Sequence, residues 1–398
     1  MHPADELRGV KSNNLSGKRI VLGVTGSIAA VECVRLSREL IRHGAEVIPV
    51  MTYAATHIIH PDALEFATGN KPILSLTGKV EHVSLCGKVK DPADLLLISP
   101  CTANTISKIA HGIDDTLVTT CATTALGSHI PIMLVPAMHL SMYDHIIIQH
   151  NIDRCKKAGI HIADPTIRGN KAKLAANEEI VASVIRILGT QDLANKKVLV
   201  IGGATAESID DVRVITNRSS GKTAIHLAQQ AFYRGGTVEL WLGQAGEQVP
   251  DYMNAVRFTS IDDLVSLLKR TALEHYDSII VCAALADYIP TRQKGKISSS
   301  KKQLTISCNP APKLISTLRK QAPHATLIGF KVESAPRTIE KNAMALLKGN
   351  HLDAVVANTI RGFGDDDNEI WIFRATGKST HKKGTKEQLA NDVLDIIK

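Results

Sequence analysis

Two glycine-containing stretches carry residue types that bind phosphate groups. One covers residues 17–30, GKRIVLGVTGSIAA, and the other covers residues 196–222, KKVLVIGGATAESIDDVRVITNRSSGK, near the midpoint of the 398-residue chain. In each, glycine permits a tight turn after a short apolar run. The polar residues ahead of a helix-like run leave N–H donors and a positive dipole end facing an anion. An ordinary strand, loop and capped helix explains such a stretch equally well, because glycine-rich turns after strands are common.

Strands and helices must present these side chains. Short apolar runs at Ile20–Val24 and Val198–Ile201 are typical of strands buried on both faces, and helix-like runs follow at Ile28–Arg42 and Thr223–Arg234. Further strands are predicted at Glu46–Met51, Leu95–Ser99 and Ile132–Val135. This alternation predicts an α/β fold with two tandem domains and mostly parallel sheets. Each domain would hold one phosphate-bearing ligand at the carboxyl end of its first strand.

Polar residues also follow the later strands of the first half. Thr52 follows the second strand, and residues 100–105, PCTANT, follow the third. Small or hydroxyl side chains at these places would let a ring or a phosphate group approach. A plain strand-to-helix turn at Thr52 and a capped helix start at residues 100–105 account for the same residues without a ligand.

The composition narrows the class of ligand. The net charge is +8, but 47 basic residues are scattered among 39 acidic ones, and aromatic residues make up only 4% of the chain. These features argue against a surface that stacks single-stranded nucleic acid, so small phosphorylated ligands are the simpler prediction. At roughly 100–200 residues per domain, the length fits two or three domains.

Cysteine usage and the N-terminal residues bear on the compartment. The seven cysteines include no CxxC pair, which predicts neither a zinc knuckle nor a disulfide framework and fits a reducing cytosol. Residues 1–16 are predicted to form a loose arm, and they lack the apolar core of a signal peptide. No apolar run approaches the length that spans a bilayer. We therefore expect a soluble cytoplasmic protein without a membrane or nucleic-acid partner.

Several segments resemble a known pair of enzyme families. Residues 99–120 are similar to the substrate and flavin loop of the phosphopantothenoylcysteine decarboxylases, residues 135–145 (VPAMHLSMYDH) to their PAMN-xx-MW segment, and His82 to their catalytic histidine. The second half resembles phosphopantothenate–cysteine ligase in segments 202–222, 282–290, 294–298, 309–315, 328–330 and 352–358. Each motif is weak by itself. The ordered set covers most of the chain, in the order of the fused bifunctional coenzyme A enzyme in an archaeal-like variant.

For residues 1–190, the resemblance implies a flavodoxin-like, parallel-sheet flavoprotein domain. It would use FMN to decarboxylate 4'-phosphopantothenoylcysteine to 4'-phosphopantetheine. His82 would be the base that assists oxidation of the cysteine thiol, although a lone histidine is more often structural. The implied FMN contacts are Gly26, Ser27, Thr52, Ser99, Thr102 and Met138, and the implied substrate contacts are Asn104, His139 and Met142.

Two departures from the family pattern affect this first half. His139 stands where the bacterial-type motif has Asn; it can hold the substrate carboxylate, but with a charge that depends on pH. The clamp region, residues 164–179, has no Cys to serve as the proton donor. Cys155 is near in sequence, but it falls in a helix-like run where a buried structural thiol is expected. Lys171, Lys173 or water are the other donors considered.

For residues 191–398, the resemblance implies a doubly wound, nucleotide-binding ligase domain. The carboxylate of 4'-phosphopantothenate would attack CTP to give an acyl-cytidylate, and the amine of cysteine would attack that intermediate. Lys296 would supply the cation at the phosphate, and Asn217 would hold the acyl-cytidylate. Mg²⁺ is implied by the triphosphate. The implied CTP contacts are Ala283, Asp287, Lys296, Pro312, Lys313, Leu314, Ile315 and Phe330.

Each of these residues could also have a purely structural role. Lys296 could be one of many solvated lysines, and Phe330 could be a core residue. Residues 364–369, GDDDNE, are predicted to form a solvated turn between two strands, and a lysine of the family falls on Asn350 here.

Two other functional classes stay open at this stage. One is a flavin prenyl-transfer enzyme, against which the ligase-like half and His82 argue. The other is a non-catalytic phosphatase-binding flavoprotein, which often has a long acidic tail that this sequence lacks. The choice between CTP and ATP also stays open. The family suggests a homo-oligomer with trimeric decarboxylase and dimeric ligase contacts, whose size the sequence does not give.

Overall fold

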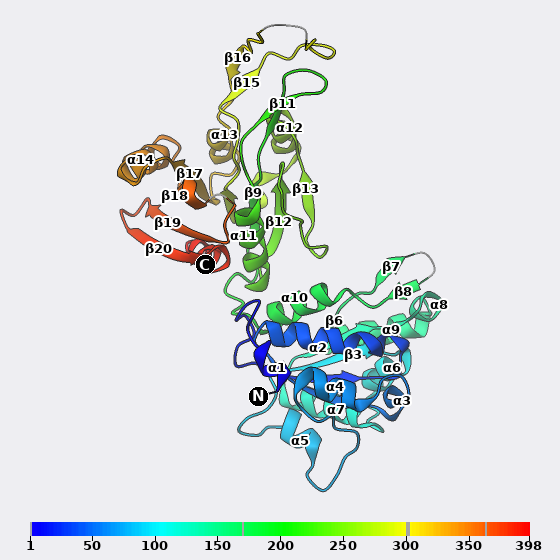
Figure 1. Cartoon of the computed structure of the whole chain (residues 1–398). Coiled ribbons are helices and arrows are strands. Elements are labelled where there is room, and N and C mark those ends of the chain that lie inside the picture. Colours follow the sequence, from blue (N-terminus) through cyan, green and yellow to red (C-terminus); the bar gives the residue numbers. More distant parts are fainter. Residues whose placement is uncertain (1, 169–170, 300–302, 363) are drawn as a thin grey trace. The chain divides into compact units, whose positions relative to one another are not determined.

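The computed structural model describes residues 2–168, 171–299, 303–362 and 364–398. It divides into two units, Met1–Gly189 and Thr190–Lys398 (Figure 1). No helix in the described ranges is both long enough and apolar enough to cross a membrane. All seven cysteines are free thiols.

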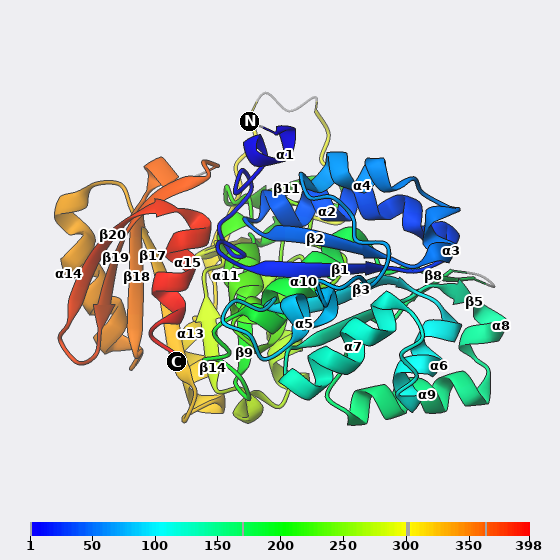
Figure 2. The ribbon, with the colours of Figure 1, turned by 90° about the horizontal axis from the view of Figure 1, so that it is seen from below.

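The first unit is built on a five-stranded, wholly parallel sheet. Its strands are β1 (Arg19–Val24), β2 (Glu46–Met51), β3 (Leu95–Cys101), β4 (Ile132–Pro136) and β6 (His161–Ile162), in the order β2-β1-β3-β4-β6. Figure 2 shows β2, β1 and β3 side by side. This is the strand order of flavodoxin-like folds, in which the order of strand addition reverses between β1 and β3. The predicted parallel flavodoxin-like sheet is confirmed.

Helices cover both faces of this sheet. Against one face, residues of α5, α6, α7 and α9 pack with Val21, Leu96 and Ile98, while α2 and α4 pack against β2 on the other. The helices of the unit are α1 (Pro3–Glu6), η1 (Ile28–Glu32), α2 (Cys33–Arg42), α3 (Tyr53–Thr56), α4 (Pro61–Thr68), α5 (Glu81–Cys86), α6 (Ala103–His111), α7 (Leu117–Ser128), α8 (Leu140–Tyr143), α9 (Ile146–Lys157) and α10 (Asn177–Leu188). A small antiparallel sheet joins β5 (Met138–His139), β8 (Lys171–Lys173) and β7 (Thr166–Arg168).

The N-terminal arm differs from the prediction. Residues 1–16 were expected to be loose, but Leu15 is fully buried and Ala4 is 2% exposed. Backbone N–H groups of Lys11 and Leu15 donate to the carbonyls of Arg42 and His43, at the end of α2. The arm is therefore held by hydrogen bonds and by burial of apolar side chains. The expected helix Ile28–Arg42 is also divided, into the 3₁₀ turn η1 and α2.

The second unit has an eight-stranded sheet. Its order is β13-β12-β9-β14-β17-β18-β19-β20, and only the last two strands run antiparallel to their neighbours. The strands are β9 (Lys197–Gly202), β12 (Thr237–Leu242), β13 (Ala255–Arg257), β14 (Ser278–Val281), β17 (Thr326–Glu333), β18 (Ala354–Thr359), β19 (Asp367–Arg374) and β20 (Ser379–Thr385). Its six parallel strands follow the Rossmann order 3-2-1-4-5-6, in which the order of strand addition reverses between β9 and β14.

Apolar cores lie on both faces of this second sheet, so it is doubly wound as predicted. Residues of α11 and α15 pack on one face, and residues of α12, α13 and α14 pack on the other. The helices are α11 (Lys222–Tyr233), α12 (Ile261–Arg270), η2 (Leu273–His275), α13 (Leu314–Gln321), η3 (Pro336–Thr338), α14 (Ile339–Gly349), η4 (Ile360–Gly362) and α15 (Lys386–Leu394).

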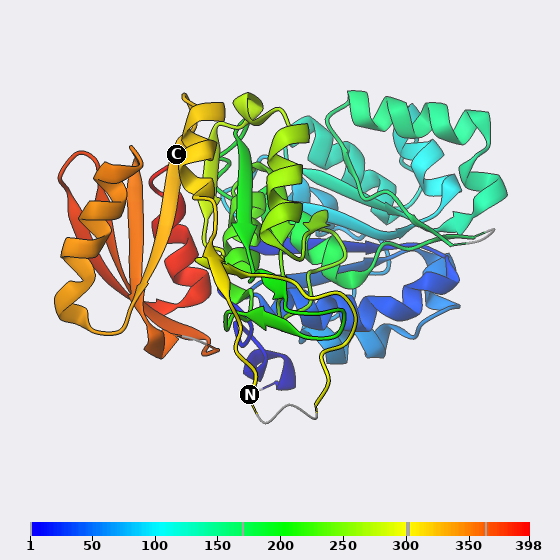
Figure 3. The same cartoon turned by 90° about the horizontal axis from the view of Figure 1, so that it is seen from above.

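Two short ribbons extend from the second sheet. One is β10 (Ala206–Ser208) paired with β11 (Val214–Thr216), and the other is β15 (Tyr288–Pro290) paired with β16 (Cys308–Pro310). β10 contacts β15, and Figure 3 shows the green and the yellow ribbon running beside each other.

Candidate functional site

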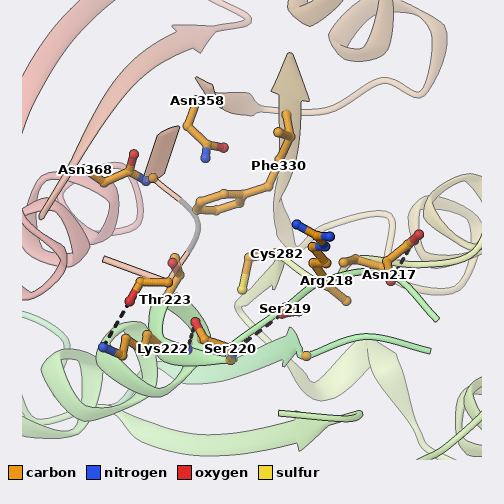
Figure 4. Close-up of a pocket in the computed structure, with 18 of the residues that line it drawn as sticks. Asn217, Arg218, Ser219, Ser220, Lys222, Thr223, Cys282, Phe330, Asn358 and Asn368 are labelled. Carbon is orange, nitrogen blue, oxygen red and sulfur yellow. Dashed lines mark hydrogen bonds between the residues drawn. The ribbon is translucent and has the colours of Figure 1, made fainter. Parts of the chain in front are cut away.

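A cavity of about 470 Å³ opens in the second unit where the strand order reverses. Its walls come from the carboxyl ends of β9, β14, β17 and β18 and from residues 217–224, which lead into α11. Ligands of open α/β sheets bind at this kind of place. In Figure 4 the ring of Phe330 extends from β17 toward the middle of the lining residues, between Asn358 and Cys282.

Glycine lets the first strand and helix of this unit meet at the cavity. A Cβ on Gly202 would lie 2.1 Å from the Cβ of Ala224 in α11, which is closer than real Cβ contacts come. The next residue, Gly203, has φ +76° and lines the cavity. The helix begins after Gly221 without a side-chain cap. The first turn of α11 therefore faces the cavity with backbone N–H donors and the positive end of its dipole.

Asn217 is held in one orientation by the loop after β14. Its amide nitrogen donates to the carbonyls of Ala284, at 3.3 Å, and Leu285, at 2.9 Å. The opposite amide orientation would place its oxygen against two carbonyl oxygens. These contacts commit the two N–H groups to the protein, so the amide oxygen is left to accept a hydrogen bond from a ligand.

Two lysine ammonium groups lie on the helix side of the cavity, and one of them is paired with Asp366 and Glu247. Lys222 and Lys386 both line it, and Lys386 is only 5% exposed. Lys222 is 2.7 Å from Asp366, whose hydrogen bond raises the pKa of this lysine. Burial, and then repulsion from Lys222, lower the pKa of Lys386, whose ammonium donates to the carbonyl of Asp365. An anion in the cavity would relieve the repulsion between these two ammonium groups.

The structure brings together only some of the residues predicted for CTP. Of these, Ala283, Asp287 and Phe330 line the cavity, and so does Asn217, which was predicted to hold the acyl-cytidylate. Among the described residues that form its walls, Lys296 and residues 312–315 do not appear. Leu314 instead packs in the core of the unit at 4% exposure. Of the other residues in this segment, Pro312 and Lys313 are exposed, and Ile315 packs at the edge of the core.

Other lining residues were missed from the sequence. They include Lys222, Lys386, Asn358 and Asn368. The stretch 364–369 was predicted to be a solvated turn between two strands. Residues 364–367 are exposed, after β18 and at the start of β19, but Gly364 and Asn368 also line the cavity. Only the SSGK motif, which contains Lys222, offered a signal, because a phosphate-binding loop often ends in lysine.

The first unit gathers its predicted residues at the carboxyl edge of its sheet. Thr25, which the sequence analysis did not single out, joins two strand ends there: its buried hydroxyl donates to the carbonyl of Pro100 at 2.7 Å and accepts from the N–H of Thr102 at 3.1 Å. Gly26 comes next, and a Cβ on it would lie 2.5 Å from the Cβ of Ala54. The turns after β1, β2 and β3 are thus packed tightly against one another.

Three predicted FMN contacts cap helices at this edge. Ser27 caps η1, Thr52 caps α3, and Thr102 caps α6, each by accepting a backbone N–H. Thr52 also donates to the carbonyl of Val24. Ser99 differs, because its hydroxyl is buried and has no hydrogen-bond partner among the described residues. A buried hydroxyl of this kind fits a polar ligand that would complete its hydrogen bonding.

His82 has a second unpartnered polar atom. It lies in α5, which packs against α7, and its Nδ1 is buried without a partner in the described part of the chain. The ring as a whole is partly exposed. The partial exposure of the ring leaves it open to contact with a ligand, which a packed core histidine would not be.

The clamp lies beside His139. In the small antiparallel sheet, His139 pairs with Lys171 and Met138 pairs with Ala172. The His139 ring caps α8, because its Nδ1 accepts from the N–H of Ser141. In the neutral ring the proton is then on Nε2, which can donate to a carboxylate. Residues 169–170 of the clamp lie outside the described residues.

The remaining predicted residues of this unit differ in exposure. Asn104 and Met142 are exposed, and Met138 is half-buried. Cys155 is 1% exposed in α9 and belongs to the core. Burial raises the pKa of its thiol to about 11. This supports the structural role expected for Cys155.

Comparisons with known proteins agree with the two halves. Residues 9–189 match the family described as Flavoprotein, and residues 193–398 match the DNA/pantothenate metabolism flavoprotein C-terminal domain. A coenzyme A biosynthesis bifunctional protein CoaBC from Thermococcus kodakarensis is 42% identical over 402 residues, which cover 100% of this chain and 99% of that protein. The protein of the same name from Methanocaldococcus jannaschii is 36% identical and covers 100% of this chain and 98% of its own.

A solved structure is similar to part of the chain. The DNA/pantothenate metabolism flavoprotein from Streptococcus pneumoniae is 26% identical with a TM-score of 0.46, and the match covers 51% of this chain and 98% of that one.

The two full-length relatives match both halves of the chain, whereas the two other functional classes considered would match only the first half. The resemblance found in the motifs is thereby confirmed: the chain belongs to the family of coenzyme A biosynthesis bifunctional proteins, which join a decarboxylase and a ligase in one polypeptide.

Proposed function

We propose that residues 191–398 join cysteine to 4'-phosphopantothenate at the expense of CTP. The carboxylate of the pantothenate would attack the α-phosphate, pyrophosphate would leave, and the acyl-cytidylate would react with the amine of cysteine to release CMP. The cavity at the reversal point of the Rossmann-ordered sheet carries this proposal, because it combines two lysine ammonium groups with a fixed amide. Both steps build negative charge that such groups stabilise.

The residues divide this work by their chemistry. Lys222, Lys386 and the first turn of α11 suit the phosphate groups. The amide oxygen of Asn217 suits an N–H of the substrate or of the attacking amine. Lys296 is exposed, and it is proposed as the cation that offsets repulsion between the attacking carboxylate and the phosphate.

Mg²⁺ is proposed to come with the triphosphate. In the described ranges, no three His, Cys, Asp or Glu side chains group so that they could hold a metal ion. Asp287, which lines the cavity, would then contact the ribose or a water of the ion. Chelation should stop pyrophosphate release and should leave the fold intact by circular dichroism.

We propose that residues 1–190 decarboxylate the product of the ligase with FMN. The unpartnered hydroxyl of Ser99 and the helix caps at the same sheet edge fit this cofactor, with Ser27 and Thr52 toward its phosphate. Bound FMN supplies reversible hydride acceptance. The partly exposed ring of His82 would take the thiol proton, and the Nε2–H of His139 would hold the substrate carboxylate. With Cys155 buried, the clamp or water is left as the source of the returning proton.

The decisive experiment supplies the purified chain with 4'-phosphopantothenate, cysteine and either CTP or ATP. We expect pyrophosphate and CO₂ with CTP and a yellow, FMN-containing protein. Activity with ATP alone would overturn the nucleotide assignment, and a colourless protein that releases no CO₂ would overturn the FMN assignment.

The two units are also proposed to work as separate domains in a cytoplasmic homo-oligomer, with trimeric decarboxylase and dimeric ligase contacts. Residues 191–398 expressed alone should still make 4'-phosphopantothenoylcysteine. A folded fragment without ligase activity would contradict the division at residue 190. Light scattering of the full chain would test the assembly, and a monomer would refute it.

A further inference from the structure

The loop that carries Lys296 is fastened to a turn between β10 and β11. This turn, Ile209–Arg213, meets the loop 291–297 through hydrogen bonds on both sides. The N–H of Gln293 donates to the carbonyl of Ile209 at 2.9 Å. The following residues of the loop are held by the two carboxylates of the turn, Asp210 and Asp211.

Asp210 is a buried carboxylate with four donors. Its side chain has no exposed surface. One oxygen accepts from the N–H groups of Val212 and Arg213, at 2.8 and 2.7 Å. The other accepts from the Arg213 guanidinium at 2.6 Å and from the N–H of Ile297 at 3.0 Å. The hydrogen bond from Ile297 is the largest of the interactions that lower the pKa of this carboxyl.

Asp211 binds the backbone on the N-terminal side of Lys296, whereas Asp210 binds it on the C-terminal side. One of its oxygens accepts from Arg292 at 2.8 Å, and the other accepts from the N–H of Gly295 at 3.0 Å. Its side chain is 47% exposed. The residues immediately before and after Lys296 therefore each donate their backbone N–H to one of two adjacent carboxylates. Arg213 adds a bond from its guanidinium to the carbonyl of Ile297.

The two carboxylates bind only backbone groups next to Lys296 and not its side chain. Lys296 itself is exposed, and among the described residues its ammonium has no hydrogen bond or ion pair. A buried carboxylate is a costly way to hold an ordinary surface loop, because the charge must be taken out of water. Its cost is offset where the position of the held group matters.

We propose that Asp210 and Asp211 are positioning residues: they fix the backbone on both sides of Lys296, which is not among the described walls of the cavity, so that its free side chain can extend to the phosphate of a bound nucleotide. This inference rests on the proposed role of Lys296 in the ligase reaction. The two carboxylates fix the peptide groups on both sides of the lysine and leave its side chain free to bind an anion. Neither carboxylate is among the described residues that line the cavity.

The first test measures the loop itself in the full chain, without substrate. Asp211→Asn should speed hydrogen exchange in a peptide covering residues 293–297 by about tenfold, because the amide lacks the negative charge and keeps only one acceptor oxygen for the two donors, Arg292 and Gly295. Asp353→Asn is a matched control. Its side chain is 48% exposed and accepts from Arg319 at 2.6 Å and from the N–H of Leu327 at 2.8 Å. Equal exchange in Asp211→Asn and the control would overturn the proposal.

The second test is a double-mutant cycle on pyrophosphate release. We expect Asp211→Asn to lower kcat about tenfold with little change in the KM for CTP, and Lys296→Gln to lower it about 10²–10³-fold. If Asp211 acts through Lys296, then Asp211→Asn should cost less than about twofold more in the Lys296→Gln background. Asp210→Asn should behave alike with a larger effect, and Asp211→Asn keeps the test open if that buried variant does not fold.

The outcomes separate this inference from the proposed function. Effects that multiply across the cycle would overturn the positioning role and leave the ligase assignment standing. Full activity of Lys296→Gln would overturn the role of Lys296 and the positioning role together. Absence of pyrophosphate release from the unmodified chain with CTP or ATP would overturn the proposed ligase reaction first.

Discussion

Asn217→Asp should separate the two steps of the ligase. In the structure the amide nitrogen of Asn217 donates to the carbonyls of Ala284 and Leu285. An aspartate would replace this donor with an acceptor and would face two carbonyl oxygens. It would therefore turn away from its place, and it would bring a negative charge next to a bound phosphate ester.

The size of the effect follows from these contacts. Each hydrogen bond contributes about 1 kcal/mol net, so loss of both costs about 2 kcal/mol, or about thirtyfold in rate. Repulsion between the new carboxylate and the phosphate adds to this, and we expect a loss of at least about 10² in the step that needs the held intermediate. Activation should suffer less, because that step depends on a cation that the substitution leaves in place.

The assay follows pyrophosphate, acyl-cytidylate and final product in the same quenched samples. Asn217→Asp should release pyrophosphate and accumulate or lose acyl-cytidylate, whereas Lys296→Gln should give neither. Asn70→Asp is the control, because it removes a hydrogen bond from a side-chain amide to the carbonyl of Val47 in the other unit. If Asn217→Asp and Lys296→Gln stop at the same step, with no intermediate from either, the division of roles is wrong.

Three further predictions use the rest of the chain. His82→Asn should lower CO₂ release by about 10²–10⁴-fold with FMN bound and ligation intact; full CO₂ release would remove His82 from the mechanism. Cys155→Ser should give the normal yield of 4'-phosphopantetheine, since the thiol is buried, and an altered flavin spectrum with lost product would contradict this. Arg234 holds the pKa of Asp192 at about 2, so the stabilisation is present above the unfolded value near 3.9 and is lost as the pH falls toward 2. Asp192→Asn should therefore cost roughly 1 kcal/mol in urea unfolding at pH 7, and an equal cost at pH 2 would refute the reasoning.

Local patterns determined the architecture. The strand at Glu46–Met51 was predicted to the residue, because a buried parallel strand is a short apolar run between polar turns. The glycine turns and the capped helix start at residues 100–105 were predicted for a similar reason, since a turn or a cap depends on neighbours a few residues away. The order of the motifs along the chain then indicated the family, because motif order can be read without knowing which residues are in contact.

Contacts between distant segments were decided only by the tertiary structure. Nothing in the composition of residues 1–16 indicates that Leu15 is fully buried. Likewise, the solvated turn predicted at 364–369 contributes Asn368 to the cavity, because β18 and β19 bring it beside the first turn of α11. The orientation of the Asn217 amide depends on carbonyls 67 and 68 residues away. A sequence fixes periodicity and turn chemistry locally, but burial and hydrogen-bond partners depend on which strand ends share an edge, and that is a property of the folded sheet.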